Sequence, residues 1–462
     1  MNTDDVLSHL DANLDPARER WFDLLRIPSI SAQPAHAADC VRTAEWMRDQ
    51  FAGLGFDVAV HGTAGHPVVL GHHPGPGGDT PHVLFYGHYD VQPADPLELW
   101  HADPFEPKLT DGPHGKRVVA RGAVDDKGQV MTWLEAMRAW HAVSGTLPCR
   151  VTVLVEGEEE IGSPNLEPFL LAHVEALRAD VAVISDTGMW DIDTPAVTTR
   201  LRGMVYTQVN LRAADKDLHS GIFGGSALNP INALTRILGG LHDADGRIQV
   251  PGFYDGIPVI SNSLAAEWDA LGFDEAAFLG SVGLKTPVGE KGFPALQRMW
   301  GRPTADINGI WGGYQGAGSK TVIAAEAGAK VSFRLVPGQD PARVVEGFKA
   351  FVEARKPADA QVEVQVFSTA PGVAIPDDGR FVRLARQALA EEYGRPAVVI
   401  GAGGSIPVVE SMHRLLGLDS LLVGVGLDDD QVHSPNEKFE WRCFHKGMRS
   451  HVRLLGALGG VS

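Results

Sequence analysis

The sequence predicts an α/β fold with a mostly parallel sheet, interrupted by an inserted α+β domain. In the first 185 residues, short apolar runs alternate with segments of helical periodicity, a succession typical of a parallel sheet covered by helices. From about Arg200 the strands alternate apolar and polar residues, which is typical of a sheet with one solvated face. The first pattern returns after Pro376. We therefore expect one domain at 1–199 and 376–462 and an inserted domain at 200–375.

The elements of the first domain follow one another along the chain. Apolar periodicity predicts helices at 4–26, 38–53, 129–141 and 166–179, and strands at 57–60, 68–70, 83–86, 150–155 and 181–185. In sheets of this kind, functional residues collect beyond the carboxyl ends of the strands. His88, Glu158–Glu160 and Asp186 all follow predicted strands, so these side chains are the first candidates for a functional site.

The insert and the last part of the chain are predicted in the same way. The insert is expected to contain strands at 204–211, 329–336 and 362–367 and helices at 229–238 and 348–354; strands at 397–400 and 420–425 and a helix at 443–458 complete the first domain. A chain of 462 residues exceeds the size at which a single hydrophobic core stops growing. This length supports a division into two domains.

Composition and charge exclude several classes of protein. The formal net charge is −18, whereas binding nucleic acid or an anionic membrane takes clustered Lys and Arg, so we expect neither partner. Cys40, Cys149 and Cys443 are far apart and form no C-x-x-C pair, which predicts free thiols in a reducing compartment. No basic and apolar leader and no long apolar run is present, so we expect a cytoplasmic protein.

The stretch Val83–Pro93 is the first to suggest chemistry. Its apolar run Val83–Tyr86 predicts a buried strand that Gly87 breaks, and His88 and Asp90 follow two residues apart. In an extended chain both side chains point to the same side. A histidine that binds a metal through one nitrogen needs its other N–H held, and a nearby carboxylate does this. Alone, the pair is a weak signal, because most exposed His and Asp side chains are simply solvated.

The rest of the chain supplies a matching set of candidate ligands. They are Asp125 within Gly122–Gly128, a residue within Glu156–Gly162, Asp186, and His433 within Val432–Glu437. Together with His88, these imidazoles and carboxylates suit Zn²⁺, with Mn²⁺ or Co²⁺ as alternatives. Each residue alone has an ordinary interpretation as a loop histidine, a helix cap or a solvated acid. The joint pattern favours cations, because three adjacent glutamates after an apolar strand crowd like charge.

A series of segments across nearly the whole chain matches one family in that family's order. The segments are Gly87–Pro93, Arg121–Gly128, Glu156–Ser163, Ser185–Asp186, Leu218–Gly221, Phe333–Pro337, Gly403–Pro407 and His433–Lys438. By these segments the chain resembles the M20 metallopeptidases, and within them the carnosinase-like, cytosolic dipeptidase branch. The resemblance implies a zinc-peptidase-like architecture for the first domain and a lid and dimerisation role for the insert.

The resemblance implies a site for two divalent metal ions. The implied ligands are His88 and Asp186 for one ion, Glu160 and His433 for the other, and Asp125 as a bridge. The family pattern Glu-Glu-x-Gly-Ser fits Glu159–Ser163, so Glu159 is the implied general base and Glu158 falls outside the pair. Asp90 is implied to orient His88.

The remaining implied roles concern the substrate. His219 is implied to stabilise the oxyanion of the partner subunit's substrate in a homodimer. Arg334 is implied to bind the C-terminal carboxylate of the substrate, which suits a bidentate guanidinium. Thr321, Gly404 and Ser405 are implied as further substrate contacts.

These residues lead to one expected activity and two alternatives. We expect a dinuclear zinc dipeptidase that hydrolyses short peptides with a free C-terminal carboxylate, using a metal-activated water and Glu159 as base. An N-acyl-amino-acid deacylase, which removes acetyl or succinyl groups, has the same architecture. A catalytically silent metal-binding relative would have lost the base or a ligand, and this chain keeps them all. A nucleotide site finds no support, because the glycine-rich run Gly71–Gly78 lacks a Lys-Ser/Thr ending.

Overall fold

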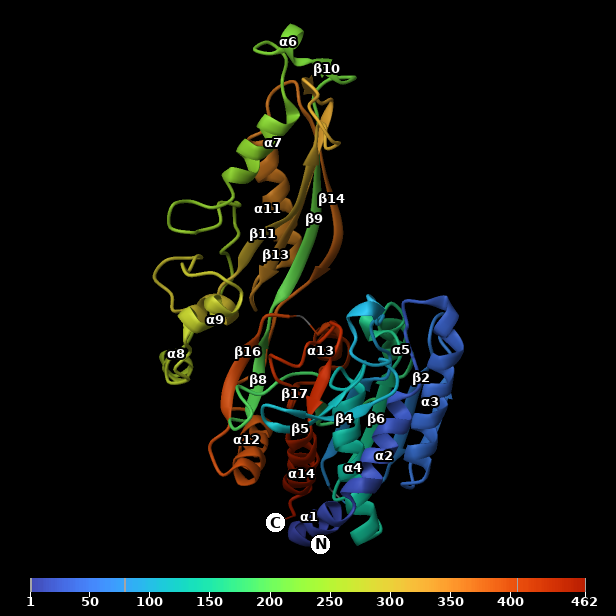
Figure 1. The fold of residues 1–462 in the computed structure, drawn as a ribbon. Helices are drawn as coiled ribbons and strands as arrows, with labels where there is room; N and C mark the ends of the chain where they lie inside the picture. Colours follow the sequence, from blue (N-terminus) through green and yellow to red (C-terminus); the bar gives the residue numbers. More distant parts are fainter. Residues whose placement is uncertain (1, 79, 405, 462) are drawn as a thin grey trace. The chain divides into compact units, whose positions relative to one another are not determined.

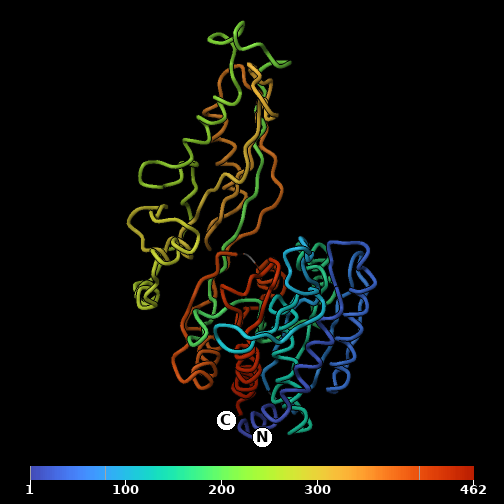
Figure 2. The backbone as a smooth tube through the Cα atoms, in the orientation of Figure 1, coloured from blue at the N-terminus to red at the C-terminus, as the bar shows by residue number. Residues whose placement is uncertain are grey.

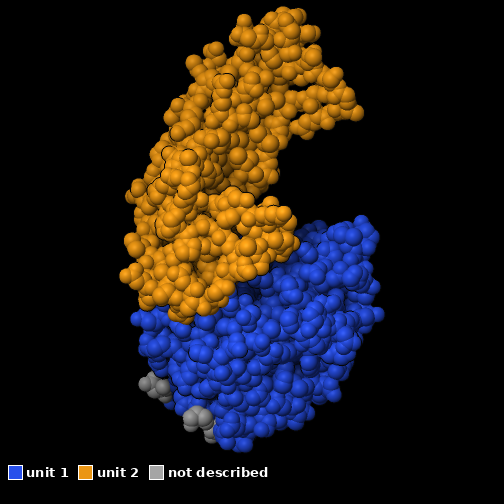
Figure 3. All heavy atoms as spheres, turned by 60° about the vertical axis from the view of Figure 1, so that its left-hand side comes forward, with its two compact units in different colours: residues 1–199, 375–400, 407–462 blue, residues 200–374, 401–406 orange. Residues whose placement is uncertain are grey.

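The computed structural model describes residues 2–78, 80–404 and 406–461, which form two compact units (Figure 3). Unit 1 contains Met1–Thr199, Ile375–Ile400 and Pro407–Ser462, and unit 2 contains Arg200–Ala374 and Gly401–Ile406. These limits differ from the expected domains at residue 375 and at 401–406. The latter segment groups with unit 2, where the amide of Arg202 donates to the carbonyl of Gly404 (3.2 Å).

The larger sheet of the described residues has nine strands with a parallel centre (Figure 1). Its order is β1 (Asp57–His61), β2 (Val68–His73), β6 (Arg150–Glu156), β3 (His82–His88), β7 (Val181–Ile184), β17 (Ser420–Leu422), β8 (Ala196–Leu201) and β15 (Val373–Ala374), with β16 (Val398–Ala402) paired to β8. Strands β6, β3, β7 and β17 pair in parallel, whereas β1, β2, β8 and β15 pair antiparallel. The predicted parallel sheet is therefore confirmed at its centre.

The helices of unit 1 pack against the sheet and against one another. Their bounds are α1 (Thr3–Ala12), α2 (Leu14–Leu25), α3 (Ala37–Ala52), α4 (Lys127–Ser144), α5 (Leu166–Ala172), α12 (Arg380–Tyr393), α13 (Pro407–Ser411) and α14 (Trp441–Leu458), and a π-helical turn covers Met412–Leu416. Helix α14 contacts α1, α4 and α12, and Figure 2 shows α1 and α14 side by side. Aromatic packing joins this group, since the rings of Trp21 and Phe444 stack with centroids 4.2 Å apart.

One predicted helix is shorter than expected. The segment predicted at 166–179 is helical only over Leu166–Ala172 and continues as turns. Nδ1 of His173 lies 2.9 Å from the carbonyl of Phe169, the acceptor that the next helical amide would use. The side chain thus competes with the backbone for this acceptor, and the apolar spacing beyond it does not continue the helix.

A small sheet in unit 1 lies outside the sequence prediction. It joins β4 (Lys108–Gly112), β5 (Gly115–Val119) and β18 (Lys438–Glu440) in the antiparallel order β18-β5-β4. These strands are polar and β18 has only three residues, so no apolar alternation marks them. Strand β5 leads into the loop that carries Asp125, and β18 directly follows the loop that carries His433.

Unit 2 is built on an antiparallel sheet of four strands in the order β11-β13-β9-β14. The bounds are β9 (Gly203–Arg212), β11 (Thr304–Gly312), β13 (Glu326–Leu335) and β14 (Gln361–Ala370), with helices α7 (Pro230–Gly239) and α11 (Pro341–Glu353). Every second residue of β9 is buried, and Val205, Phe333 and Phe348 belong to the core beneath the two helices. The predicted α+β insert with one solvated sheet face is confirmed.

Several short elements complete unit 2. They are β10 (Leu218–His219), α6 (Ser220–Phe223), α8 (Asn262–Asp269), α9 (Glu275–Ser281), α10 (Ala295–Gly301) and β12 (Val322–Ile323), with β10 paired to β12. In the chain as a whole, Cys40, Cys149 and Cys443 are buried free thiols. Among the described residues, no helix is long and apolar enough to cross a membrane.

Candidate metal centre

Two groups of candidate metal ligands share Asp125. The ligand atoms of His88, Asp125 and Asp186 lie within 4.8 Å of one another, as do those of Asp125, Glu160 and His433. Nε2 of His88 lies 3.2 Å from Oδ1 of Asp125, and Nε2 of His433 lies 3.0 Å from Oδ2. Nε2 of His433 is also 3.1 Å from Oε2 of Glu160. The two oxygens of Asp125 thus face different imidazoles, as expected of a carboxylate that bridges two ions.

The fold brings these five residues together from separate segments. His88 is the last residue of β3, Asp186 follows β7, and Glu160 lies in the single 3₁₀ turn after β6. Because β6, β3 and β7 are parallel neighbours, their carboxyl ends meet at one edge of the sheet. Asp125 lies between β5 and α4, and the peptide bond that follows it is cis. His433 precedes β18, which pairs with β5.

Asp90 holds both His88 and the glutamate segment. Nδ1 of His88 lies 3.3 Å from Oδ1 of Asp90 and 3.1 Å from its carbonyl oxygen. The Asp90 carboxylate also accepts hydrogen bonds from the amides of Glu159 (3.2 Å) and Glu160 (3.1 Å). The side chains of His88 and Asp90 are fully buried. Asp90 can therefore fix the imidazole so that its Nε2 points at the ligand group.

Glu158 differs from the two glutamates that follow it. Its carboxylate accepts hydrogen bonds from the amide of His66 (3.0 Å) and from Nδ2 of Asn165 (2.8 Å). A carboxylate with both oxygens engaged in this way serves as a buried acceptor that joins two loops. Glu158 belongs to neither ligand group, which agrees with its place outside the family pair.

Glu159 and Glu160 also have different surroundings. Oε2 of Glu160 faces His433 and accepts a hydrogen bond from Nε2 of Gln92 (2.8 Å). Glu159 belongs to neither ligand group of the described residues. Burial raises the pKa of the Glu159 carboxyl to about 7, opposed by the nearby His88. A pKa near neutrality suits a group that takes up and releases a proton.

Buried acids crowd the centre. Burial raises the pKa of Asp186 and of Asp126 well above the usual carboxyl range, and the charge of Asp125 adds to both shifts. Burial acts on Asp125 in the same direction, but the imidazoles of His433 and His88 hold its pKa below the usual range. Cations relieve such crowding of negative charge.

The donor set fits a pair of divalent ions. Nε2 of His88 is buried and, although it lies 3.2 Å from Oδ1 of Asp125, it makes no hydrogen bond with the described residues, as expected of a nitrogen that faces a metal. Two imidazoles with Asp and Glu carboxylates are the ligands of Zn²⁺ sites, and Mn²⁺ or Co²⁺ accept the same donors. The residues therefore suit the two-metal site, while the donor set leaves the identity of the metal open.

Arg334 and His219 lie toward opposite ends of β9. Arg334 of β13 pairs with Met204, near the start of β9. Strand β9 ends at Arg212, and His219 lies beyond that end on β10 (Figure 1). The extended chain from Met204 to Arg212 spans about 26 Å at about 3.3 Å per residue. These two side chains of one chain are therefore too far apart to contact the same dipeptide.

The other expected substrate contacts also belong to unit 2. Thr321 adjoins His219, since its carbonyl accepts a hydrogen bond from the amide of Ser220 (3.0 Å). Gly404 is exposed and contacts the backbone of Arg202. Ser405 lies outside the described residues. Thr321 and Gly404 are thus placed in the structure, but neither shows a feature that identifies a substrate.

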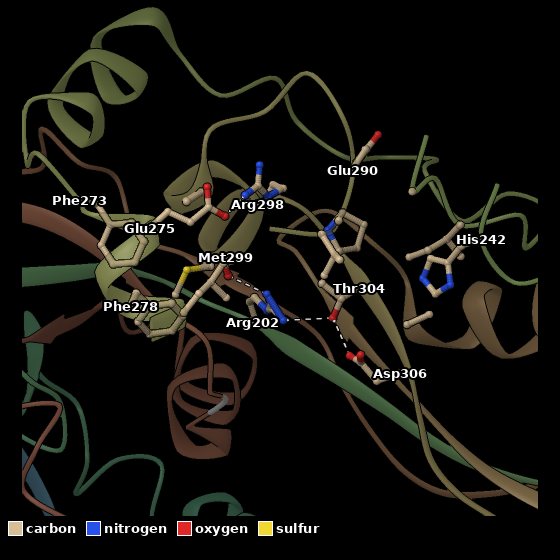
Figure 4. Close-up of a pocket in the computed structure, with 18 residues that line it drawn as sticks. Arg202, His242, Phe273, Glu275, Phe278, Glu290, Arg298, Met299, Thr304 and Asp306 are labelled. Atoms are coloured by element: carbon tan, nitrogen blue, oxygen red, sulfur yellow. Dashed lines mark hydrogen bonds and ion pairs between the residues drawn. The ribbon is translucent and has the colours of Figure 1, made fainter. Parts of the chain in front are cut away.

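A cavity of about 520 Å³ lies within unit 2 (Figure 4). Its wall includes Phe273, Phe278 and Met299 beside Arg202. The Arg202 guanidinium donates to the carbonyl of Met299 (2.7 Å) and to Oγ1 of Thr304 (3.2 Å). No ligand group of the described residues includes a residue of this cavity. The Nε of Arg202 is buried and makes no hydrogen bond with the described residues, and these contacts do not identify a ligand.

Two residues that support the ligands have no role assigned from the sequence. Gln92 contacts Glu160, and Glu437 contacts the loop of Asp125. Both lie inside segments that carry the family resemblance, Gly87–Pro93 and His433–Lys438. The family motifs include both residues, but only the hydrogen bonds in the structure show that Gln92 contacts Glu160 and that Glu437 contacts the Asp125 loop.

Comparison with known proteins places the chain in a family. A model of peptidase family M20/M25/M40 matches residues 84–457, which is most of the chain. The chain therefore belongs to peptidase family M20/M25/M40. This finding confirms the resemblance to M20 peptidases and identifies the chain as a member of a family of hydrolases that act on peptide bonds.

The similar proteins include metallodipeptidases. Cys-Gly metallodipeptidase dug1 of Schizosaccharomyces pombe is 30% identical over 481 residues, covering 100% of this chain and 99% of the relative. Beta-Ala-His dipeptidase of Homo sapiens is 32% identical over 362 residues, 77% of this chain and 70% of the relative. The solved structure of the di-peptidase Dug1p from Saccharomyces cerevisiae gives a TM-score of 0.81 at 27% identity, covering 99% of this chain and 98% of that one. The resemblance to the carnosinase-like dipeptidase branch is confirmed.

Glu156, the last residue of β6, is a buried acid beside the centre that belongs to neither ligand group. Its Oε1 accepts hydrogen bonds from the hydroxyls of Tyr86 (2.6 Å) and Ser163 (2.9 Å). Burial raises the pKa of its carboxyl to about 8; the Tyr86 hydrogen bond opposes this shift and the charge of Asp90 reinforces it.

Glu156→Gln should reduce the pH dependence of stability. A carboxyl with a raised pKa binds its proton more tightly in the folded chain, so its contribution is present below about pH 4.5 and is lost as the pH rises through about 8. At about 1.4 kcal/mol per pKa unit, the loss is on the order of 5 kcal/mol. Urea unfolding of chelator-treated proteins should show a smaller fall in unfolding free energy for the variant between about pH 5 and pH 8. Equal falls in the two proteins would contradict this assignment.

Proposed function

We propose that the chain is a dinuclear metal-dependent dipeptidase, with Zn²⁺ as the favoured metal and Mn²⁺ or Co²⁺ as alternatives. The observation that carries the proposal is Asp125, whose two oxygens face two separate groups of ligands. Relatives along most of the chain are named for Cys-Gly and β-Ala-His dipeptides, which supports a short peptide as substrate. A cytoplasmic location agrees with the buried free thiols.

Each ligand has a place in this proposal. His88 and Asp186 would hold one ion, Glu160 and His433 would hold the other, and Asp125 would be shared between them. Bound there, two such ions would supply the Lewis acidity that activates a water and polarises the scissile carbonyl. The three ligand carboxylates carry less charge than two divalent ions, and a fourth would neutralise the pair and weaken its Lewis acidity. Glu159 is therefore best used as a proton carrier and not as a ligand.

Glu159 moves the proton of the reaction. Its carboxylate takes a proton from the attacking water and then delivers it to the leaving amine, as general base and then general acid. The amide of Glu159 donates to the Asp90 carboxylate. This hydrogen bond fixes the backbone from which the Glu159 side chain extends. A pKa raised to about 7 by burial favours both proton uptake and release near neutral pH.

Unit 2 supplies the proposed substrate contacts. Arg334 binds the free C-terminal carboxylate of the substrate through its planar guanidinium. His219 donates to the oxygen that becomes negative when water attacks the carbonyl. Thr321, Gly404 and Ser405 are further proposed contacts to the substrate.

The separation of Arg334 from His219 along β9 supports a homodimer in which each active site takes His219 from the partner chain. Arg334 lies beside the start of β9, and His219 lies beyond its end. One dipeptide cannot reach both side chains of a single chain, because the strand between these two points is about 26 Å long. Two copies related by a twofold axis can supply one residue each. The insert is accordingly the proposed dimerisation and lid domain.

A hydrolysis panel tests the proposed activity. Zinc- or manganese-loaded protein is assayed on Cys-Gly, β-Ala-His and other dipeptides, and on N-acetyl and N-succinyl amino acids, with and without chelator. We expect chelator-sensitive cleavage of dipeptides only, because removing the ions removes the activated water. Cleavage of the acylated amino acids instead would move the function to deacylation. Metal-loaded protein that cleaves neither set would be a silent relative.

Glu159→Gln should abolish turnover while preserving metal content. Loss of a general base lowers turnover about 10²–10⁴-fold, and the five ligands remain. The measurements are kcat on a cleaved dipeptide and bound metal per chain. Glu158→Gln is the matched control: it alters the acceptor of His66 and Asn165, so it should lower stability more than turnover. A collapse of turnover in the control with none in Glu159→Gln would reverse the assignment of these two residues.

Mixing two inactive variants should restore activity if His219 acts across the dimer. In a mixed dimer of His219→Ala and Glu159→Gln chains, one site combines Glu159 of the first chain with His219 of the second. Half of the randomly assorted dimers are mixed and each has one complete site, so about a quarter of the parent activity should return. The assay follows dipeptide cleavage after subunit exchange, with each variant alone as control. No recovery despite exchange would place His219 in its own chain's site.

A further inference from the structure

Glu437 is a fully buried carboxylate that belongs to neither ligand group of the described residues. Its Oε1 accepts hydrogen bonds from the amides of Val124 (2.9 Å) and Asp125 (3.1 Å). Its Oε2 accepts from the amide of Gly122 (2.9 Å) and from the guanidinium of Arg121 (2.8 Å). One side chain thus satisfies three backbone amides in the loop that presents the bridging carboxylate.

The hydrogen bonds to the Glu437 carboxylate begin where the ladder between β18 and β5 ends. Lys438 of β18 pairs with Val119 of β5, and the next amide, that of Ala120, donates to the carbonyl of Glu437 (3.1 Å). Beyond Ala120 the chain leaves the ladder, and its buried amides need other acceptors. The amides of Arg121 and Ala123 use the carbonyls of Pro104 and Ala120. The carboxylate of Glu437 serves the other three amides, including that of Asp125.

Arg121 extends the link to a third segment. Its guanidinium pairs with Glu437, and the two side chains are each 1% exposed. The same guanidinium donates to the carbonyl of Pro93 (3.0 Å), at the end of the segment that begins with His88. The Arg121–Glu437 pair therefore connects the segments of three proposed ligands. A buried pair of this kind is strongly disrupted when one partner is removed, because the other charge stays buried.

The loop that carries His433 needs such an anchor. Gln431, His433 and Asn436 have φ values of 57°, 61° and 64°, in the left-handed region that is unfavourable for non-glycine residues and persists only under outside restraint. The Asn436 side chain provides one restraint, accepting from the amide of His101 (2.8 Å) and donating to the carbonyl of Leu99 (2.8 Å). Glu437, the next residue, provides a second.

We propose that Glu437 is a positioning residue for the metal centre, which fixes the Asp125 carboxylate and holds the His433 loop beside it. The inference rests on the proposed two-metal site. Because Asp125 belongs to both ligand groups, displacing its loop changes both groups at once. Partners that orient metal ligands typically affect metal affinity 10–100-fold when they are replaced, and Glu437 acts through more backbone contacts than a single such partner.

Glu437→Gln tests the proposal in the full chain. The amide keeps the shape of the side chain but directs an NH₂ group at backbone donors and leaves Arg121 without its counter-charge. Chelator-treated parent and variant are titrated with Zn²⁺ against a colorimetric chelator, and both are also loaded with Co²⁺ for visible absorption. We expect Zn²⁺ affinity to fall about 10–100-fold and the Co²⁺ spectrum to change, since ligand geometry changes.

Glu440→Gln is the matched control for a merely structural effect. Glu440 is equally buried, lies three residues further along the same segment, and sits 3.2 Å from Nζ of Lys438. Among the described residues, Glu440 makes no hydrogen bond or ion pair with the Asp125 loop, so its replacement should lower the unfolding temperature of the metal-free protein without changing Zn²⁺ affinity or the Co²⁺ spectrum. Equal losses of affinity in the two variants would overturn the inference.

Glu437→Asp decides the matter if Glu437→Gln does not fold. It keeps the charge opposite Arg121 but withdraws the carboxylate by one methylene, so Zn²⁺ affinity should fall at least about 10-fold. Parent-like affinity and Co²⁺ spectrum in the folded variant would overturn the positioning role, while dipeptide cleavage by the parent would leave the proposed function intact. A parent chain that binds no metal would overturn both.

Discussion

The carboxylate of Asp125 holds two imidazoles at once, and much of unit 1 keeps that carboxylate in place. Its oxygens lie 3.2 Å from Nε2 of His88 and 3.0 Å from Nε2 of His433. Several buried acids surround it, and like charges in a dry site repel strongly. Repulsion between these carboxylates would push their segments apart, and the hydrogen bonds around them oppose that movement. Asp90 acts from the side of β3, and Glu437 from the side of β18.

The strands and helices that the sequence could predict are those with a strong apolar pattern. Buried strands such as β3 and β6, and the amphipathic helices around them, follow from periodicity because burial and spacing coincide there. Helix α5 ends early because the His173 side chain takes a backbone carbonyl, which periodicity cannot express. Strands β4, β5 and β18 are short and polar, so only their pairing defines them.

The candidate site was partly predictable for similar reasons. Parallel strands place His88, Asp186 and the glutamates at one edge, so their approach follows from the order of elements. The choice among three adjacent glutamates came from the family pattern, and the contacts of Glu158 with His66 and Asn165 give a physical reason for it. The hydrogen bonds from the Asp125 loop to Glu437 could not be predicted, because a loop held by a side chain has no periodic pattern of residues in the sequence.

The position of β17 in the parallel sheet has a consequence for how the protein is made. This strand, Ser420–Leu422, lies between β7 and β8, although unit 2 is encoded before it. On the ribosome, unit 2 has its own core and is complete while the sheet of unit 1 still lacks a central strand. Contacts so distant in sequence form late. The residues of the two candidate ligand groups therefore converge only when synthesis is nearly finished, because His433 follows β17 in the chain.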